Sequence, residues 1–228
     1  MEPEQIKKLK NLLDEKVRLY NQPSFILGDP IVVPHSFSKK QDVEISGLFA
    51  AVLAWGNRTS IINNCHRLMA WMDNAPYDFI LNHKDTDLKK MLGFAHRTFN
   101  ATDLLYFIEF LQHHYQKHDS LEDAFAPERK YAHDTVEQAL IHFHNYFFSI
   151  EHPDRTRKHI STPQRKSACK RINMYLRWMV RKDKHGVDFG IWKKISPAQL
   201  VCPLDVHVAR VAQRLGLIEN DKSNWQNA

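Results

Sequence analysis

Long hydrophobic runs are missing from this sequence of 228 residues. A helix needs roughly 18 consecutive, mostly apolar residues to cross a bilayer, and no segment approaches that length. The segment 1–10 mixes acidic, basic and polar side chains and lacks the pattern of a signal peptide. We therefore expect a cytoplasmic protein with no membrane partner.

Cysteine is scarce, and its spacing excludes several kinds of site. The three cysteines, Cys65, Cys169 and Cys202, lie far apart, whereas zinc and iron–sulfur ligands usually come in closely spaced pairs. The 14 histidines are spread over the chain and form no single tract. We expect three reduced thiols, no metal site, no iron–sulfur cluster and no cofactor.

The alternating polar and apolar pattern of a half-buried strand is also nearly absent, with Ile31-Val32-Val33 as the only candidate. No Gly/Ser-rich or Pro-rich linker divides the chain, and no repeat recurs at a solenoid period. These absences predict an all-α monomer that folds as a single unit over 1–228. Its two possible lobes are 1–41 plus 150–228, and 42–149.

What the sequence does contain is helical periodicity. Apolar residues recur at three- and four-residue steps from Ile6 to Tyr20, which predicts an amphipathic helix. A loop with several prolines follows over 21–37, and Asp42 can begin a helix that ends near Trp55, before Gly56. Further helices are predicted at 59–72, 84–92, 102–118, 134–149, 163–182 and 204–215.

Positive charge is concentrated in one segment. The chain carries a net charge of +6, but Arg155 to Lys184 holds eleven basic residues against one acid, or +10, which leaves −4 for the remainder. Such clustering favours binding to a polyanion, because each neutralised phosphate releases condensed counterions. A solvated basic helix face is the alternative.

Two segments in the last third hold candidate catalytic residues, Lys166 and Asp205. Pro203 suits the first turn of a helix, and Asp205 beside it lies near the positive end of the helix dipole, where a carboxylate is stabilised. Lys166 is a candidate amine nucleophile next to Arg165. Helix capping by Asp205 and phosphate contact by Lys166 are the alternative roles.

Arg165-Lys166-Ser167-Ala168 and the segment 203–211, Pro-Leu-Asp-Val-His-Val-Ala-Arg-Val, resemble motifs of endonuclease III-type DNA glycosylases of the helix-hairpin-helix superfamily. The tail 209–218 is similar to archaeal 8-oxoguanine DNA glycosylases. The resemblance implies a two-lobed, all-α DNA-repair fold that excises a flipped base from double-stranded DNA. It implies that Lys166 forms a Schiff base with the sugar while Asp205 assists.

Segment 51–60 is similar to the helix-turn of these enzymes whose polar residue fills the space left by the extruded base. The resemblance gives that role to Asn57, with Trp55 and Arg58 stacking on or clamping the opened site. A core position is the alternative for Trp55. The other predicted DNA-binding residues are Arg155, Arg157, Lys158, Arg165 and Lys170, and the pocket candidates are His96, Arg97 and His207.

The hairpin before Lys166 departs from the family pattern. These enzymes carry a Gly-x-Gly turn there, whereas this chain reads Ser161-Thr162-Pro163-Gln164, and Pro163 removes a backbone donor. The hairpin is therefore degenerate. The leading hypothesis is a nucleoid-associated DNA N-glycosylase/AP lyase acting on a damaged base, with an oxidised purine as a candidate substrate. The alternatives are a catalytically silent DNA-binding module and a helical protein-interaction domain.

Overall fold

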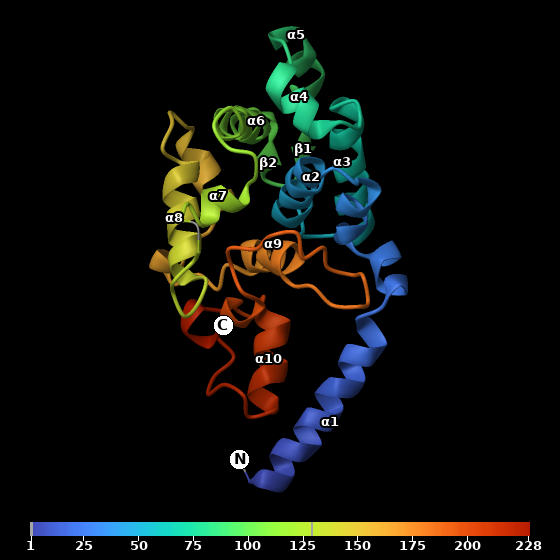
Figure 1. Cartoon of the computed structure of the whole chain (residues 1–228), viewed down its shortest axis with the longest axis vertical. Coiled ribbons are helices and arrows are strands. Elements are labelled where there is room, and N and C mark those ends of the chain that lie inside the picture. Colours follow the sequence, from blue (N-terminus) through green and yellow to red (C-terminus); the bar gives the residue numbers. More distant parts are fainter. Residues whose placement is uncertain (1, 129) are drawn as a thin grey trace.

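Helices make up most of the chain, which confirms the all-α class. The computed structural model describes residues 2–128 and 130–228, and Figure 1 shows the arrangement of its elements. The α-helices are α1 (Pro3–Tyr20), α2 (Lys40–Val52), α3 (Arg58–Trp71), α4 (Pro76–Asn82), α5 (Asp85–Leu88), α6 (Ala101–Tyr115), α7 (Glu122–Phe125), α8 (Glu137–Phe147), α9 (Lys170–Val180) and α10 (Val206–Arg214).

Short 3₁₀ turns lie between these helices and after α10. They are η1 (Pro23–Gly28), η2 (Pro30–Val32), η3 (Pro34–Ser36), η4 (Lys89–Met91), η5 (Asp154–His159), η6 (Pro163–Arg165), η7 (Pro197–Gln199) and η8 (Trp225–Asn227). The sheet among the described residues has two antiparallel strands, β1 (Ala95–His96) and β2 (Phe99–Asn100). No helix of the described residues combines the length and apolar character that a membrane span requires.

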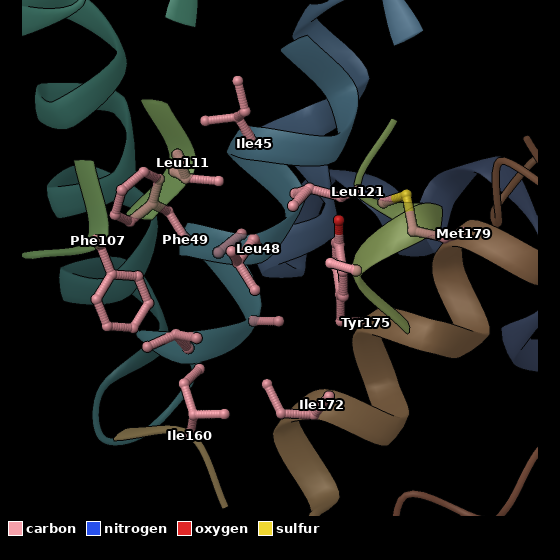
Figure 2. Packing of buried hydrophobic residues seen from close by; sticks show 14 of the residues in the cluster. Ile45, Leu48, Phe49, Phe107, Leu111, Leu121, Ile160, Ile172, Tyr175 and Met179 are labelled. Carbon is pink, nitrogen blue, oxygen red and sulfur yellow. The ribbon is translucent and has the colours of Figure 1, made fainter. Parts of the chain in front are cut away.

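Helix α2 is the centre of the core, and all its residues from Asp42 to Val52 are buried. Figure 2 shows apolar side chains of α2 and α9 packed together beside Leu121. Gly47 allows the close approach of α9, because a Cβ there would lie 2.8 Å from the Met179 methyl group and 3.3 Å from the Tyr175 ring. This packing fixes the start of α9 next to the end of α2.

None of the residues of helix α1, the longest helix of the described residues, is buried. In Figure 1 it projects away from the α2–α9 body on the same side as α10. Residues of α1 and of the end of α10 line a shallow groove. The periodicity from Ile6 to Tyr20 therefore predicted the helix, but its apolar stripe remains exposed in this chain.

The only strand candidate, Ile31-Val32-Val33, lies in 3₁₀ turns within the loop predicted over 21–37. Pro30 and Pro34 fix φ near the helical value and lack the N–H that a strand would donate. Ile31 and Val33 are fully buried, so this apolar run reflects burial in the core and not pairing in a sheet. Helices α4 and α7 were not predicted.

The predicted helix over 163–182 begins only at Lys170. Lys166 and Cys169 adopt left-handed backbone conformations, with φ values of 59° and 50°. Such conformations interrupt a right-handed helix. The carbonyl of Lys166 accepts a hydrogen bond from the backbone N–H of Trp225, at 3.1 Å, and Ser167 pairs with Asn224. The C-terminal segment thus holds the turn that precedes α9.

Two buried histidines, His114 and His159, should make the stability of the fold sensitive to acid. Burial lowers the pKa of His114 and of His159 from 6.5 to about 4. The folded state therefore binds fewer protons than the unfolded state between these values, so stability is lost as the pH falls through about 6.5 towards about 4. We expect a loss of about 2 kcal/mol per histidine between pH 7 and pH 4.5.

Urea unfolding at the two pH values measures this loss. In His114→Gln the difference between pH 7 and pH 4.5 should shrink by one histidine's share, since glutamine does not titrate. An unchanged pH dependence in the variant would contradict the assignment of the effect to His114. His66 is exposed on α3, and His66→Gln is the matched control that keeps the full difference.

Candidate functional site

A cleft of about 750 Å³ opens where the turn between α2 and α3 meets the starts of α9 and α10. This volume lies within the range of roughly 300–1,000 Å³ common for ligand sites. Its lining combines cationic, acidic and aromatic side chains, among them Asp29, Trp55, Arg58, Lys158, Lys170, Arg171, Asp205 and His207. The cleft therefore brings together residues that are far apart in sequence.

Lys170 and Asp205 form an ion pair in this cleft, with the Lys170 Nζ 2.6 Å from the Asp205 Oδ2. Both side chains are half-buried, with 40% and 28% of their surfaces exposed. Lys170 is the first residue of α9, and Asp205 caps α10 by accepting the Val208 N–H at 2.8 Å. Two helix starts thus position the pair.

The Asp205 carboxyl is held in its anionic form. Partial burial raises its pKa, but the hydrogen bonds from Lys170 and from the backbone N–H of Val208 outweigh burial and leave the pKa below its usual value. The carboxylate is thus available to stabilise positive charge next to the Lys170 amine.

Lys166, the lysine expected to meet Asp205, lies outside the cleft lining. The Lys166 side chain is exposed. Its backbone adopts a left-handed conformation in the turn that precedes α9. The expected convergence of Lys166 with Asp205 is therefore corrected: the lysine that reaches Asp205 is Lys170, which the sequence had placed among the phosphate contacts. The α9 helix starts at Lys170, so this residue lies beside the start of α10.

The turn between α2 and α3 contributes Trp55 and Arg58 to the cleft. Asn57, the expected space-filling residue, is exposed and caps α3 by accepting the Ser60 N–H at 3.1 Å. Gly56 allows this turn with a φ of 105°. The role of Asn57 in an opened duplex stays a prediction, whereas its capping role is a feature of the fold.

His96 and Arg97 lie behind Trp55 and not in the cleft lining. His96 is buried and contacts the Trp55 carbonyl at 3.2 Å and Asn64 at 2.9 Å. The Arg97 guanidinium is stacked over the Trp55 indole, 4.7 Å from the ring centroid. The two pocket candidates thus support Trp55, and of the three candidates only His207 lines the cleft itself.

The sequence model of one protein family, described as a protein of unknown function (DUF2400), matches residues 29–228. The chain belongs to the DUF2400 family. The matched region contains all the residues that line the cleft, and α1 lies outside it. Comparisons with curated proteins and with solved structures found no match.

The predicted DNA-binding residues of the DUF2400 chain fall into two groups. Lys158 and Arg165 are exposed, and Lys158 also lines the cleft. Arg155 is also exposed, but its guanidinium binds the buried Asp103 at 2.8 Å and the Thr98 carbonyl at 3.0 Å. The Arg155 guanidinium thus stabilises the fold through these contacts.

The other predicted phosphate contact in this segment, Arg157, also has an internal partner. Its guanidinium stacks on the Phe148 ring, with 5.3 Å to the centroid, and lies 3.8 Å from Asp154. A residue that the sequence did not single out, Arg171, lines the cleft and donates to the Val52 carbonyl at the end of α2. It ties α9 to the turn that carries Trp55.

Metal ligands are not gathered in the described part of the DUF2400 chain. Over residues 2–128 and 130–228, no group of three or more His, Cys, Asp or Glu side chains is arranged to hold a metal ion. Cys65 and Cys169 are buried free thiols, and Cys202 is an exposed one. The cleft itself is lined by amine, carboxyl and indole groups.

Proposed function

We propose that this DUF2400 protein binds double-stranded DNA and excises a flipped, damaged base as an N-glycosylase with AP lyase activity. The observation that carries the proposal is the Lys170–Asp205 pair, which opens into a cleft large enough for a nucleotide. The fold proposed with it is the two-lobed, all-α fold of the helix-hairpin-helix glycosylases, with η6 in the place of the usual hairpin.

The pair supplies the two groups that the reaction needs. As the bond from the base to the sugar breaks, the bonding electrons leave with the base and positive charge develops on the sugar, where the Asp205 carboxylate stabilises it. As the Lys170 amine bonds to the anomeric carbon, one proton of its ammonium passes across the 2.6 Å hydrogen bond to Asp205, which releases this proton to solvent and returns to the carboxylate. The sugar ring then opens: one of the two protons on the bonded nitrogen moves to the ring oxygen, the carbon–oxygen bond breaks and a C=N bond forms, which gives the protonated Schiff base.

The residues around the pair suit a nucleotide in an opened duplex. Trp55 offers an aromatic surface at the cleft, and Arg58 and Lys158 offer positive charge for phosphate groups. Base–aromatic stacking is worth about 1–3 kcal/mol per base, which helps to offset the cost of unstacking. This combination favours DNA over an acidic protein as the partner.

Borohydride trapping tests the enzyme proposal. We expect a covalent adduct between the chain and duplexes that carry an abasic site, because borohydride reduces a Schiff base to a stable amine. Duplexes with 8-oxoguanine, uracil and thymine glycol identify the excised base. The absence of an adduct with every duplex would contradict the proposal.

A second candidate is a catalytically silent DNA-binding module. It is favoured by Pro163, which begins η6 where glycosylases expose backbone amides to phosphate. This alternative predicts duplex binding that weakens with salt, without any trapped adduct.

We expect different effects on DNA binding from substitution of Lys158, which lines the cleft, and of Arg155, which binds Asp103. Lys158→Ala should lower the slope of the logarithm of affinity against the logarithm of salt concentration by about 1, since one phosphate contact is lost. Arg155→Ala should leave that slope unchanged and lower the free energy of unfolding, because it removes the partner of buried Asp103.

Duplex binding at several salt concentrations and urea unfolding measure the two effects. A reduced salt slope for Arg155→Ala, with unchanged stability, would show that Arg155 contacts phosphate and not Asp103.

A further inference from the structure

Asp29 is a second carboxyl in the cleft, and it has no role in the Schiff-base reaction proposed for Lys170 and Asp205. The residue lies between η1 and η2 and lines the same cleft as Lys170 and Asp205. Its Oδ1 accepts the Ile31 N–H at 3.1 Å and so caps η2. Capping by one oxygen can be performed equally well by asparagine or serine, so it does not account for a carboxyl at this position.

The charges around Asp29 come from two helices. Arg58 on α3 and Lys170 and Arg177 on α9 each lower the pKa of the Asp29 carboxyl, as does the Ile31 N–H. Burial outweighs them all and raises the pKa above its usual value. The other titratable groups facing the cleft are Lys158, Cys169, Arg171, Asp205 and His207.

The pKa values of the two cleft carboxyls are therefore shifted in opposite directions. The pKa of Asp205 lies below the usual value for aspartate and that of Asp29 lies above it. Two carboxyls with pKa values pushed apart in one cleft are the arrangement by which an enzyme separates an anionic group from a proton donor. Lys170 acts on both carboxyls, since its charge lowers the pKa of each.

We propose that Asp29 is the general acid that protonates the departing base, and that this base is a purine. The inference rests on the proposed glycosylase function. Purines carry ring nitrogens with free electron pairs away from the sugar bond, whereas uracil and thymine offer only carbonyl oxygens. A carboxyl that donates a proton thus fits a purine best.

The Asp29 O–H bond breaks and an N–H bond forms on the base, while the bond from the base to the sugar breaks and its electron pair stays with the base. The base leaves neutral, and Asp29 remains as a carboxylate near the positive charges of Arg58 and Lys170. The Lys170 amine bonds to the sugar carbon as before.

Asp29→Asn separates proton donation from capping. The asparagine oxygen can still accept the Ile31 N–H, but its amide is no acid. We expect single-turnover release of 8-oxoguanine or hypoxanthine from duplex DNA to fall about 10²-fold or more, the usual contribution of a general acid. In the wild type the rate should rise as the pH falls towards the Asp29 pKa, and this rise should vanish in the variant. Asp29→Glu should restore part of both.

Trapping on an abasic-site duplex keeps this inference distinct from the proposed function, because no base departs in that reaction. If the Asp29→Asn variant still forms the adduct with an abasic site but releases purines slowly, the result supports the inference. Wild-type rates and pH dependence of purine release in Asp29→Asn would overturn it while leaving the glycosylase proposal intact. A wild-type chain that neither traps an abasic site nor releases a base overturns both.

Stability is checked separately by urea unfolding of each variant. If Asp29→Asn lowers the free energy of unfolding, Asp29→Ser replaces it in the same assays, because a serine hydroxyl also caps and carries no acidic proton at these pH values. Full purine release by a stable Asp29→Ser variant would equally overturn the inference.

Discussion

Lys170→Ala is expected to lower the borohydride-trapped adduct on an abasic-site duplex by on the order of 10³-fold or more, the scale seen when a catalytic nucleophile is removed. The reason is geometric. The Lys170 amine lies 2.6 Å from the Asp205 carboxylate at the cleft, so its loss removes the nucleophile and unpairs the carboxylate. Lys166→Ala is the matched control, since Lys166 is an exposed lysine one turn upstream.

Two further measurements separate chemistry from binding. Lys170→Arg keeps a positive charge beside Asp205 but provides no amine nucleophile, so it should bind duplex DNA like the wild type and still form no adduct. Adduct loss in Lys166→Ala together with an adduct in Lys170→Ala would return the catalytic role to Lys166. It would also show that the turn before α9 rearranges on DNA.

The lysine assignment shows where local sequence patterns stop being sufficient. The pattern around Lys166 predicted a helix from 163, and within such a helix Lys166 would occupy the first turn. The actual start at Lys170 depends on two left-handed residues and on the C-terminal segment, which binds the Lys166 carbonyl through Trp225. That contact spans almost sixty positions, and helical periodicity contains no information about it.

Charge counts have a similar limit. The excess of basic residues over 155–184 was correctly read from the sequence, but the count does not reveal which of them have internal partners. Arg155 binds Asp103, and Arg177 and Arg181 both bind the buried Asp188. Pairing of this kind lowers the number of cations available to phosphate.

Asp29 illustrates a third limit, because a proline-rich loop predicted only an irregular segment there. Asp before Pro is a turn signal, and the structure does place a cap at that position. Asp29 lines the cleft because η2, which it caps, packs against α2 and α3. Buried helices with strong periodicity were predictable, whereas residues that converge through loops were not.

Glu44→Ala is expected to destabilise the fold by about 3–5 kcal/mol, the largest stability change we predict. Glu44 is fully buried in α2, and its carboxyl accepts hydrogen bonds from four donors: the Tyr115 hydroxyl at 2.9 Å, the Ser120 hydroxyl at 2.5 Å, the Leu121 N–H at 3.1 Å and the Trp192 indole N–H at 2.6 Å. The donors come from three parts of the chain, so this one carboxyl links α2 to the end of α6, to the turn just before α7 and to the segment after α9.

Removal of the Glu44 carboxyl leaves all four donors buried without a partner, and each costs about 1–3 kcal/mol if the site does not relax. Water entering the space left by the side chain recovers part of that cost, which is why the expected total is below the sum. Urea unfolding measures the change, with Glu109→Ala on the exposed face of α6 as the control, expected within about 0.5 kcal/mol of the wild type. Equal midpoints for the two variants would mean that the segment around Trp192 is not held to α2 through Glu44.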